Sequence, residues 1–347
     1  MKIDRGRQSS LVLTVIGLLV VFLFCSRCSD DAPYHRPDYG LNDGMNYSNH
    51  TWNKIEAYPN AVAQTIAISS KNRVVALTSS ELIFYSVDRG VTWDTLQLSN
   101  DQFYCAAYNS TDDLFLANGK GEIYVSSNQG TGWTVLDTKS IWANILSLEF
   151  KDDIIYAGSN FGLYISTNGG LDWTRPILGL DRVAVSALTI LPDYSVLIGS
   201  PNKGIYKLLP GGAEWISSST GLPETKIISL VTTQEGHVFA GTPNDGVFLS
   251  TDKGESWNAV NEGLTDLRIK CLDINSQDII VALTGDGLFI TYNQGNTWKK
   301  YPFEIECDQI ISIAFDAGGY LFASCIDGAM FLSPQSTIKG EDDYSSN

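Results

Sequence analysis

The sequence predicts an all-β fold, a single seven-bladed β-propeller of four-stranded antiparallel blades whose ring is closed by an N-terminal strand at Trp52. Three observations predict it. Tryptophan recurs at a nearly constant interval, the same short motif precedes most of these tryptophans, and each interval holds short apolar runs separated by turn residues.

Tryptophan sets the period of the repeat. Seven of the 8 Trp residues are separated by 41, 40, 40, 42, 42 and 41 positions. A period of about 40 to 50 residues is typical of propeller blades. The periodic residues are Trp52, Trp93, Trp133, Trp173, Trp215, Trp257 and Trp298, and the eighth, Trp142, lies outside the series.

A turn motif precedes five of the tryptophans. It holds Ser or Thr, then Asp or Asn two positions later, then Gly after two more, and ends at Trp. The carboxylate or amide oxygen can accept backbone N–H groups within a turn, and Gly supplies the positive φ. The five sets are Asp88, Gly90 and Trp93; Asn128, Gly130 and Trp133; Asn168, Gly170 and Trp173; Asp252, Gly254 and Trp257; and Asn293, Gly295 and Trp298. The unit that ends at Trp215 is degenerate.

This motif resembles the Asp-box (BNR) repeat of sialidases, sortilin-type receptors, xyloglucanases and photosystem II assembly-factor-like propellers. The resemblance covers about residues 50 to 333 and implies that the boxes are structural, with each indole wedged between neighbouring sheets. Since Asn replaces Asp in three of the five copies, a set of calcium or ligand sites built on these positions is the less favoured interpretation.

Each interval contains enough strand signal for one blade. Residues 227–231, 238–241 and 246–250 alternate apolar and polar side chains around Gly turns, and a further strand opens at each Trp. After Trp298 only three strands follow, around 310–315, 320–324 and 329–333. The missing strand is at the front, so residues 50–56 are predicted to pair with the segment that ends at Ser333 and to leave no open edge.

Composition bounds the function. With 44% hydrophobic residues the chain can bury a large core, and 39 Asp and Glu against 23 Lys and Arg give a net charge of -16. Proteins that bind nucleic acid draw their affinity from Lys and Arg, so nucleic acid is excluded as the main partner.

The N-terminus has the pattern of an export signal, in which basic residues precede an apolar stretch, Leu11 to Phe24, too short for a spanning helix. The segment that starts at Cys28 resembles the start of surface lipoproteins of certain Gram-negative bacteria, with acidic residues after the lipidated cysteine. It departs from their usual pattern at Arg27 and Cys25, so an ordinary cleavage site stays open. The hypothesis is a protein anchored by lipid at Cys28 in the outer membrane or at the cell surface, with a secreted or periplasmic protein as the alternative.

These patterns divide the chain into four parts. Residues 1–27 are predicted to be a lipoprotein-type signal peptide, and 28–49 a flexible tether rich in Pro, Gly, Asn and Asp. Residues 50–333 form the predicted propeller, and 334–347 a disordered tail.

Four cysteines lie within the predicted propeller. Cys105 and Cys271 fall in a column of small residues on the innermost strands and are expected to be unpaired. A bridge between Cys307 and Cys325 is possible, but spacing does not decide it. With only 3 His and no Cys-x-x-Cys pair in the propeller, no metal site is expected, and no cofactor is predicted.

Candidate catalytic groups are few. Glu149 and Asp273 are carboxylates on the innermost strands of blades 3 and 6, and a carboxylate pair is what glycoside hydrolysis uses. Their blades lie nearly opposite one another, which exceeds the roughly 5 to 9.5 Å separation that the mechanism tolerates. The Arg-Ile-Pro run of sialidases is missing, and a xyloglucanase would need two propellers. Trp142 is a possible contact for a sugar or a protein, with a hydrophobic plug as the alternative.

The sequence therefore favours a binding or scaffold module over an enzyme. The expected partner is an extracellular or periplasmic protein or glycan, and the chain is expected to be a monomer. The alternative function is a glycosidase of the sialidase or xyloglucanase type that uses Glu149 and Asp273.

Overall fold

The protein was analysed as a computed structural model. The structure describes residues 52–55, 62–79, 82–96, 98, 101–136, 138, 141, 143–176, 178, 180, 182–223, 226–301, 305, 307 and 309–334. The predicted signal peptide and tether, the lipidation site at Cys28, and Trp142 lie outside these residues, as does the predicted tail apart from residue 334. Within the described residues, no helix is long and apolar enough to cross a membrane.

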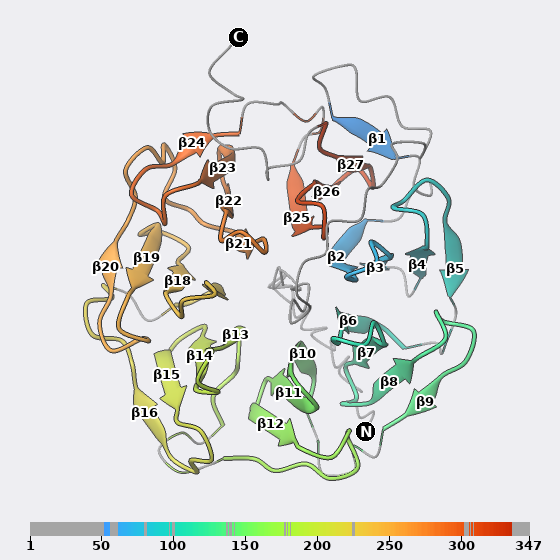
Figure 1. Cartoon of the computed structure of the whole chain (residues 1–347), viewed down its shortest axis with the longest axis horizontal. Coiled ribbons are helices and arrows are strands. Elements are labelled where there is room, and N and C mark those ends of the chain that lie inside the picture. The colour runs from blue at the N-terminus through green and yellow to red at the C-terminus, as the bar shows by residue number, and fades with distance from the viewer. Residues whose placement is uncertain are drawn as a thin grey trace, which may run out of the picture.

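Seven antiparallel sheets surround a central axis, so the predicted seven-bladed β-propeller is confirmed (Figure 1). Blades 1 to 3 comprise β2 (Ala63–Ile68), β3 (Val74–Thr78), β4 (Ile83–Ser86) and β5 (Asp94–Leu96); β6 (Phe103–Tyr108), β7 (Leu114–Asn118), β8 (Ile123–Ser126) and β9 (Thr134–Val135); and β10 (Ile145–Lys151), β11 (Ile154–Ser159) and β12 (Gly162–Ser166). Blades 4 and 5 comprise β13 (Ala187–Ile190), β14 (Val196–Ser200), β15 (Gly204–Leu208) and β16 (Trp215–Ser217); and β17 (Ser229–Thr232), β18 (Val238–Gly241), β19 (Val247–Ser250) and β20 (Asn258–Ala259). Blades 6 and 7 comprise β21 (Cys271–Ile274), β22 (Ile280–Thr284), β23 (Gly287–Thr291) and β24 (Lys299–Lys300); and β25 (Ile310–Phe315), β26 (Leu321–Cys325), β27 (Met330–Leu332) and β1 (Asn53–Ile55).

Blade 3 differs from the other six because its fourth strand is reduced to one bridge. Ile165 and Thr174 exchange two backbone hydrogen bonds of 2.8 Å each. Pro176 follows two residues later, and proline has no N–H to donate to a ladder. The chain then crosses to blade 4, where Leu178 forms a parallel bridge with Glu214.

The first strand of the chain completes the last blade. β1 pairs antiparallel with β27, with Asn53 opposite Leu332 and Ile55 opposite Met330. Figure 1 shows β1, in blue, beside β27, in red. The N-terminal strand thus closes the ring, as predicted, and covers the edge of blade 7.

Polar contacts link blade 7 to blade 1 at the same seam. The Arg89 guanidinium lies 2.5 Å from the fully buried carboxylate of Asp316 and 4.8 Å from the Tyr320 ring. The Ala317 N–H donates to the Asn72 side chain over 3.0 Å. Removing one member of a buried ion pair leaves an uncompensated charge, so this seam depends on both partners.

The hydrophobic core is divided into seven clusters, one in each gap between neighbouring blades. Each cluster contains one periodic tryptophan. Trp52 lies between blades 6 and 7, where its ring is 5.7 Å from Tyr301. Trp93 lies between blades 7 and 1. Each of the seven gaps between blades therefore contains one indole of the repeat.

The indoles are not equally deep, although the motif predicts one role for all of them. Trp52, Trp215, Trp257 and Trp298 are at most 6% exposed, whereas the indoles of blades 1 to 3 are partly exposed. The Trp257 indole N–H donates to the Ser218 carbonyl of the preceding blade over 2.7 Å. In blade 1 the Trp93 N–H donates instead to Gly90 of its own turn over 2.9 Å. The wedge role therefore applies fully only to the deeper set.

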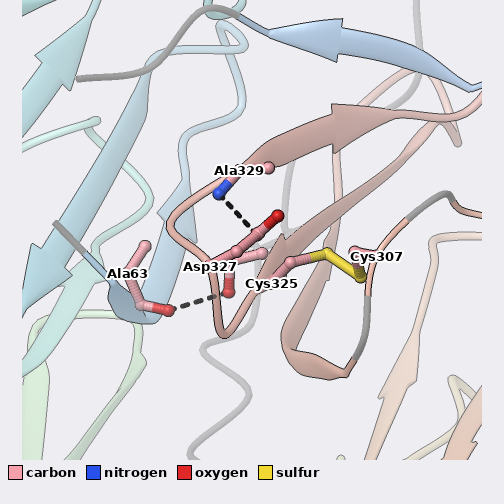
Figure 2. Close-up of a disulfide and its surroundings, with 6 residues drawn as sticks. Ala63, Cys307, Cys325, Asp327 and Ala329 are labelled. Carbon is pink, nitrogen blue, oxygen red and sulfur yellow. Dashed lines mark hydrogen bonds between the residues drawn. A yellow bond between two sulfur atoms is a disulfide. The ribbon is translucent and has the colours of Figure 1, made fainter. Parts of the chain in front are cut away.

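A disulfide joins Cys307 to Cys325 in the closing blade (Figure 2). It ties the connection before β25 to the end of β26. Beside it, the Ser324 hydroxyl donates to the Ala63 carbonyl of blade 1 over 2.8 Å. Cys105 and Cys271 are buried and form no disulfide, as expected.

We predict unequal costs for removing indoles. Trp52→Ala should lower the free energy of unfolding by roughly 3–5 kcal/mol, because it empties a buried site at the closing blade. Trp93→Ala should cost less, roughly 1–2 kcal/mol, because that ring is partly exposed and its turn keeps other hydrogen bonds. Urea unfolding of the two variants beside the parent chain measures both losses. Equal losses would contradict the difference in depth.

Candidate functional site

The two ends of the ring are built differently. In blades 1 to 6, the turn between the first and second strands and the turn that leads from the third strand to the fourth lie at one end, because the strands are antiparallel. Blade 7 contributes only the turn between its first two strands, since its fourth strand is β1. We call this the box end, since it carries the turns that precede the tryptophans, which we call box turns. The opposite end carries the turns between second and third strands and the connections between blades.

The box turns use their polar atoms internally. In blade 1, Asp88 accepts the Ser86 hydroxyl and the Thr92 N–H at 2.8 Å each, and the Gly90 N–H donates to Ser86 Oγ over 2.7 Å. Gly90 has φ of 83°, the region that favours glycine.

An amide performs the same task in blade 3. The oxygen of Asn168 accepts the Ser166 hydroxyl at 3.1 Å and the Asp172 N–H at 2.9 Å. Only this oxygen is needed to hold the turn, which explains why Asp and Asn alternate in the repeat. Across the described residues, no three His, Cys, Asp or Glu side chains come together as a group that could hold a metal ion.

Other acidic side chains at the box end tie neighbouring blades together. Asp112 of blade 2 accepts the Ser70 N–H of blade 1 over 3.0 Å, and Asp278 of blade 6 accepts the Gln234 N–H of blade 5 over 3.0 Å. Lys253 pairs with Asp193 over 2.7 Å. The acidic side chains in these links contribute to cohesion between blades.

At the opposite end, each innermost strand contains one extra residue. In four blades the pairing of the first and second strands shifts across a single position. These positions are Gln64, Tyr104, Leu146 and Ile311. In the other three blades, two consecutive residues at the start of the first strand face the same residue of the second strand. In blade 6, for example, Cys271 pairs with Leu283, and the N–H of the preceding Lys270 donates to the Leu283 carbonyl. The bulge residues of these three blades are Ser186, Ile228 and Lys270. Every blade thus has two consecutive residues opposite one, the pattern of a β-bulge.

We call these seven residues the bulge ring. Bulges re-aim side chains and occur often beside active sites. Six of the seven are partly exposed, in a segment whose neighbours are mostly buried: Phe103 and Cys105 are 4% and 3% exposed, whereas Tyr104 between them is 37% exposed. Ser186 is the exception, because it is buried and donates its hydroxyl to the carbonyls of Gly199 and Ile227.

The ring surrounds the axis of the propeller. It lies at the start of the innermost strands, of which Figure 1 shows β2, β6, β10, β13, β21 and β25 nearest the centre. Tyr104 lies against the turn between β7 and β8, where a Cβ added to Gly119 would come within 2.9 Å of the phenol ring. Leu146 and Ile311 belong to none of the seven core clusters of the described residues.

The chemistry of the bulge ring is mainly apolar. It combines three aliphatic side chains, a phenol, an amide, a hydroxyl and one cation, Lys270. Burial lowers the pKa of Lys270, and the nearby Arg268 lowers it further. Aliphatic and aromatic groups around a few polar ones are typical of a recognition surface.

The predicted carboxylates do not join this ring. Asp273 lies on β21 two positions past Cys271 and is 3% exposed, and its carboxylate accepts the Phe315 N–H of blade 7 over 2.7 Å. It therefore links two blades. Glu149 lies on β10 three blades away and is partly exposed.

The sequence did not predict the bulge ring, although Tyr104 directly precedes Cys105, one of the small residues expected on the innermost strands. A bulge is a property of the pairing between two strands, and the sequence of one strand does not display it. One sequence feature could have indicated the bulges: each bulge residue directly precedes a small residue of an innermost strand, such as Cys105 or Cys271.

Comparisons with known proteins agree on the fold. No family model and no curated protein matches the sequence. Among solved structures, YCF48 bound to D1 peptide is similar with a TM-score of 0.65 and 14% identity, over 84% of this chain and 98% of that one. Streptogramin B lyase has a TM-score of 0.68 and 14% identity, over 81% and 96%.

A further similar structure is the extracellular domain of a putative one component system from B. thetaiotaomicron. It has a TM-score of 0.66 and 15% identity, over 83% of this chain and 40% of that one. This chain therefore corresponds to less than half of that protein. At these identities the similarity establishes the seven-bladed propeller fold.

We predict that the box turn of blade 5 makes stability depend on pH. Although partial burial opposes it, hydrogen bonds from Ser256 and Ser250 lower the pKa of Asp252 to about 2. An unfolded Asp titrates near 3.9, so this stabilisation is complete above about pH 4 and is lost as the pH falls toward 2. Urea unfolding between pH 2 and 7 should show this dependence in the parent chain.

Two substitutions separate the charge from the turn. Asp252→Asn should remove the part of the pH dependence that comes from this site and keep the turn, as Asn does in blades 2, 3 and 6. Asp252→Ala should cost roughly 0.5–2 kcal/mol at pH 7, because backbone donors lose their acceptor. An Asn variant as unstable as the Ala variant at pH 7 would refute this role of the side-chain oxygen.

Proposed function

We propose that this chain is an exported propeller that binds a protein partner through its bulge ring. The observation that carries the proposal is the ring itself, in which each blade contributes one bulge residue and six of the seven are partly exposed. Leu146, Ile228 and Ile311 are partly exposed, and each has at least one buried neighbour in its strand or directly before it. Association with a partner would remove their apolar area from water.

The comparisons support this proposal by analogy. YCF48, whose fold is similar, has been solved bound to a D1 peptide, so a propeller of this shape can take a peptide. Another similar structure is an extracellular domain, which agrees with export of this chain. We also propose that the repeat belongs to the Asp-box class, because Asp88, Asn128, Asn168, Asp252 and Asn293 all hold their turns through a side-chain oxygen.

A binding role is favoured over glycoside hydrolysis. That chemistry needs two carboxylates that face one sugar. Asp273 is buried and engaged with the backbone of blade 7, and Glu149 belongs to a blade three positions away. A glycan partner remains the alternative, and it is tested below in parallel.

We further propose that residues 1–27 direct export, that a lipid on Cys28 anchors the chain to the outer membrane or the cell surface, and that residues 28–49 form a tether. The apolar stretch of 11–24 is short for a spanning helix, and acidic residues follow Cys28 directly. One acyl chain binds a bilayer only reversibly, so stable anchoring requires several chains.

The binding proposal predicts that recovery of partners depends on the bulge ring. A fragment of residues 47–347 keeps every described strand and can serve as bait for cell-surface proteins, beside a glycan array. Leu146→Asp should reduce recovery of the specific partner at least 10-fold, because it places a charge in an apolar contact. The control is Leu171→Asp on the box turn of blade 3, where Leu171 is 72% exposed. Equal recovery with both variants, or binding of glycans alone, would refute a protein site at the ring.

The anchor proposal predicts a change of cell fraction. Cys28→Ala should move the protein from the membrane pellet to the soluble fraction, because the acylated thiol is lost. Cys25→Ala is the matched control and should leave the protein in the pellet. Retention of the Cys28→Ala variant in the pellet would count against lipidation at this residue.

A further inference from the structure

We infer that the segment bound by the bulge ring carries a carboxylate, and that this carboxylate pairs with Lys270. The inference rests on the proposed function, because it names the chemistry of the partner at the same site. It follows from the place of Lys270 in the ring, the absence of an acidic partner for it among the described residues, and the charge of the rest of the chain.

Lys270 holds a fixed place on the ring. Its N–H donates to the Leu283 carbonyl over 2.7 Å, and its neighbours Ile269 and Cys271 are 2% and 1% exposed. The root of the side chain is therefore anchored in the core between blades. On either side in the ring lie the bulge residues of blades 5 and 7, Ile228 and Ile311. The adjacent bulge residues are thus both aliphatic, and Ile228 also packs against the core between blades 5 and 6.

Among the described residues, no carboxylate forms an ion pair with this ammonium. The nearby Asp266 is already engaged, since it accepts Nε of Arg268 at 3.0 Å, Nη2 at 2.6 Å and the Arg268 N–H at 2.9 Å. Arg268 also adds a second positive charge beside the lysine. Burial and this neighbour both disfavour the charged amine, in agreement with the lowered pKa of Lys270.

Lys270 is a partly buried cation in a chain with a net charge of -16. Elsewhere on the propeller, Lys71 pairs with Asp112, Lys120 with Asp101, and Lys253 with Asp193. Partly desolvated charges contribute to binding when a partner supplies the opposite charge. Lys270 therefore selects for an anionic group.

The surroundings restrict which anion fits. The net charge of -16 disfavours a polyanion. A single carboxylate on an otherwise apolar peptide matches one cation flanked by Ile228 and Ile311. Such a carboxylate comes from an Asp or Glu side chain or from a chain end, and the experiment distinguishes these two sources.

The test uses peptides selected by the protein. The full chain, purified in detergent, selects binders from a random peptide library with free C-termini, and Kd is measured by fluorescence polarisation. Lys270→Gln should raise Kd at least 10-fold, and Lys270→Arg should largely preserve it. Lys203→Gln is the matched control, because this exposed lysine lies on the turn between β14 and β15 at the same end of the ring. Melting temperatures of all variants verify that they fold.

A second arm removes the carboxylate. Each selected peptide is remade with Asp→Asn or Glu→Gln, or with an amidated C-terminus. One of these changes should raise Kd as much as Lys270→Gln does, and the two changes together should add little, because they break one pair. Selected peptides without an essential carboxylate, or an unchanged Kd with Lys270→Gln, would overturn the inference.

The two proposals fail in different ways. Peptides that lose affinity with Leu146→Asp but not with Lys270→Gln would sustain binding at the bulge ring and refute only the carboxylate pairing. Peptides insensitive to both variants, or a library without binders, would count against both proposals.

Discussion

The pairing of β1 with β27 is the constraint on which the rest of the molecule depends. Among the described residues, each core cluster lies between two neighbouring blades, so each blade is held by its two neighbours. Closure by a strand from the far end of the sequence turns seven pairwise contacts into a circle. Ile55 of this strand reaches the cluster between blades 7 and 1, so the pairing also supports the first gap.

Polar contacts add to apolar packing where blade 7 meets blade 1. Arg89 and Asp316 form a buried ion pair there, and burial raises the pKa of Asp316 despite the guanidinium beside it. The disulfide between Cys307 and Cys325 also lies in the closing blade. These links join segments more than two hundred residues apart or restrain the blade that receives the N-terminal strand. They hold blade 7 against blade 1, where the ring of short strands closes.

The box end holds neighbouring blades together, and the opposite end carries the site that we propose for the partner. At the box end, acidic and amide side chains such as Asp112 and Asn72 accept backbone N–H groups of the adjacent blade. Their hydrogen-bonding capacity is used within the fold. At the opposite end, bulge residues such as Leu146 and Ile311 are partly exposed and belong to none of the core clusters of the described residues.

The sequence was sufficient for the architecture because the periodic tryptophans report the repeat directly. It was less informative about depth, since the same motif precedes the buried Trp257 and the partly exposed Trp93. Pro176 could have indicated the reduced fourth strand of blade 3. The bulge ring and the role of Asp273 depend on pairing between strands and blades, which no single segment encodes. The predicted propeller was therefore correct in outline, whereas the candidate site required the structure.

The bulges have a consequence for how such a molecule could change its target. Hydrogen bonds of the main chain hold the bulges at Ser186, Ile228 and Lys270, and the seven bulges carry six residue types. A replacement at a bulge residue outside the core clusters, such as Leu146 or Ile311, would alter the proposed binding surface while the cores between blades stay as they are. New specificity could thus arise by single exchanges around the axis, without insertion of loops or redesign of the scaffold.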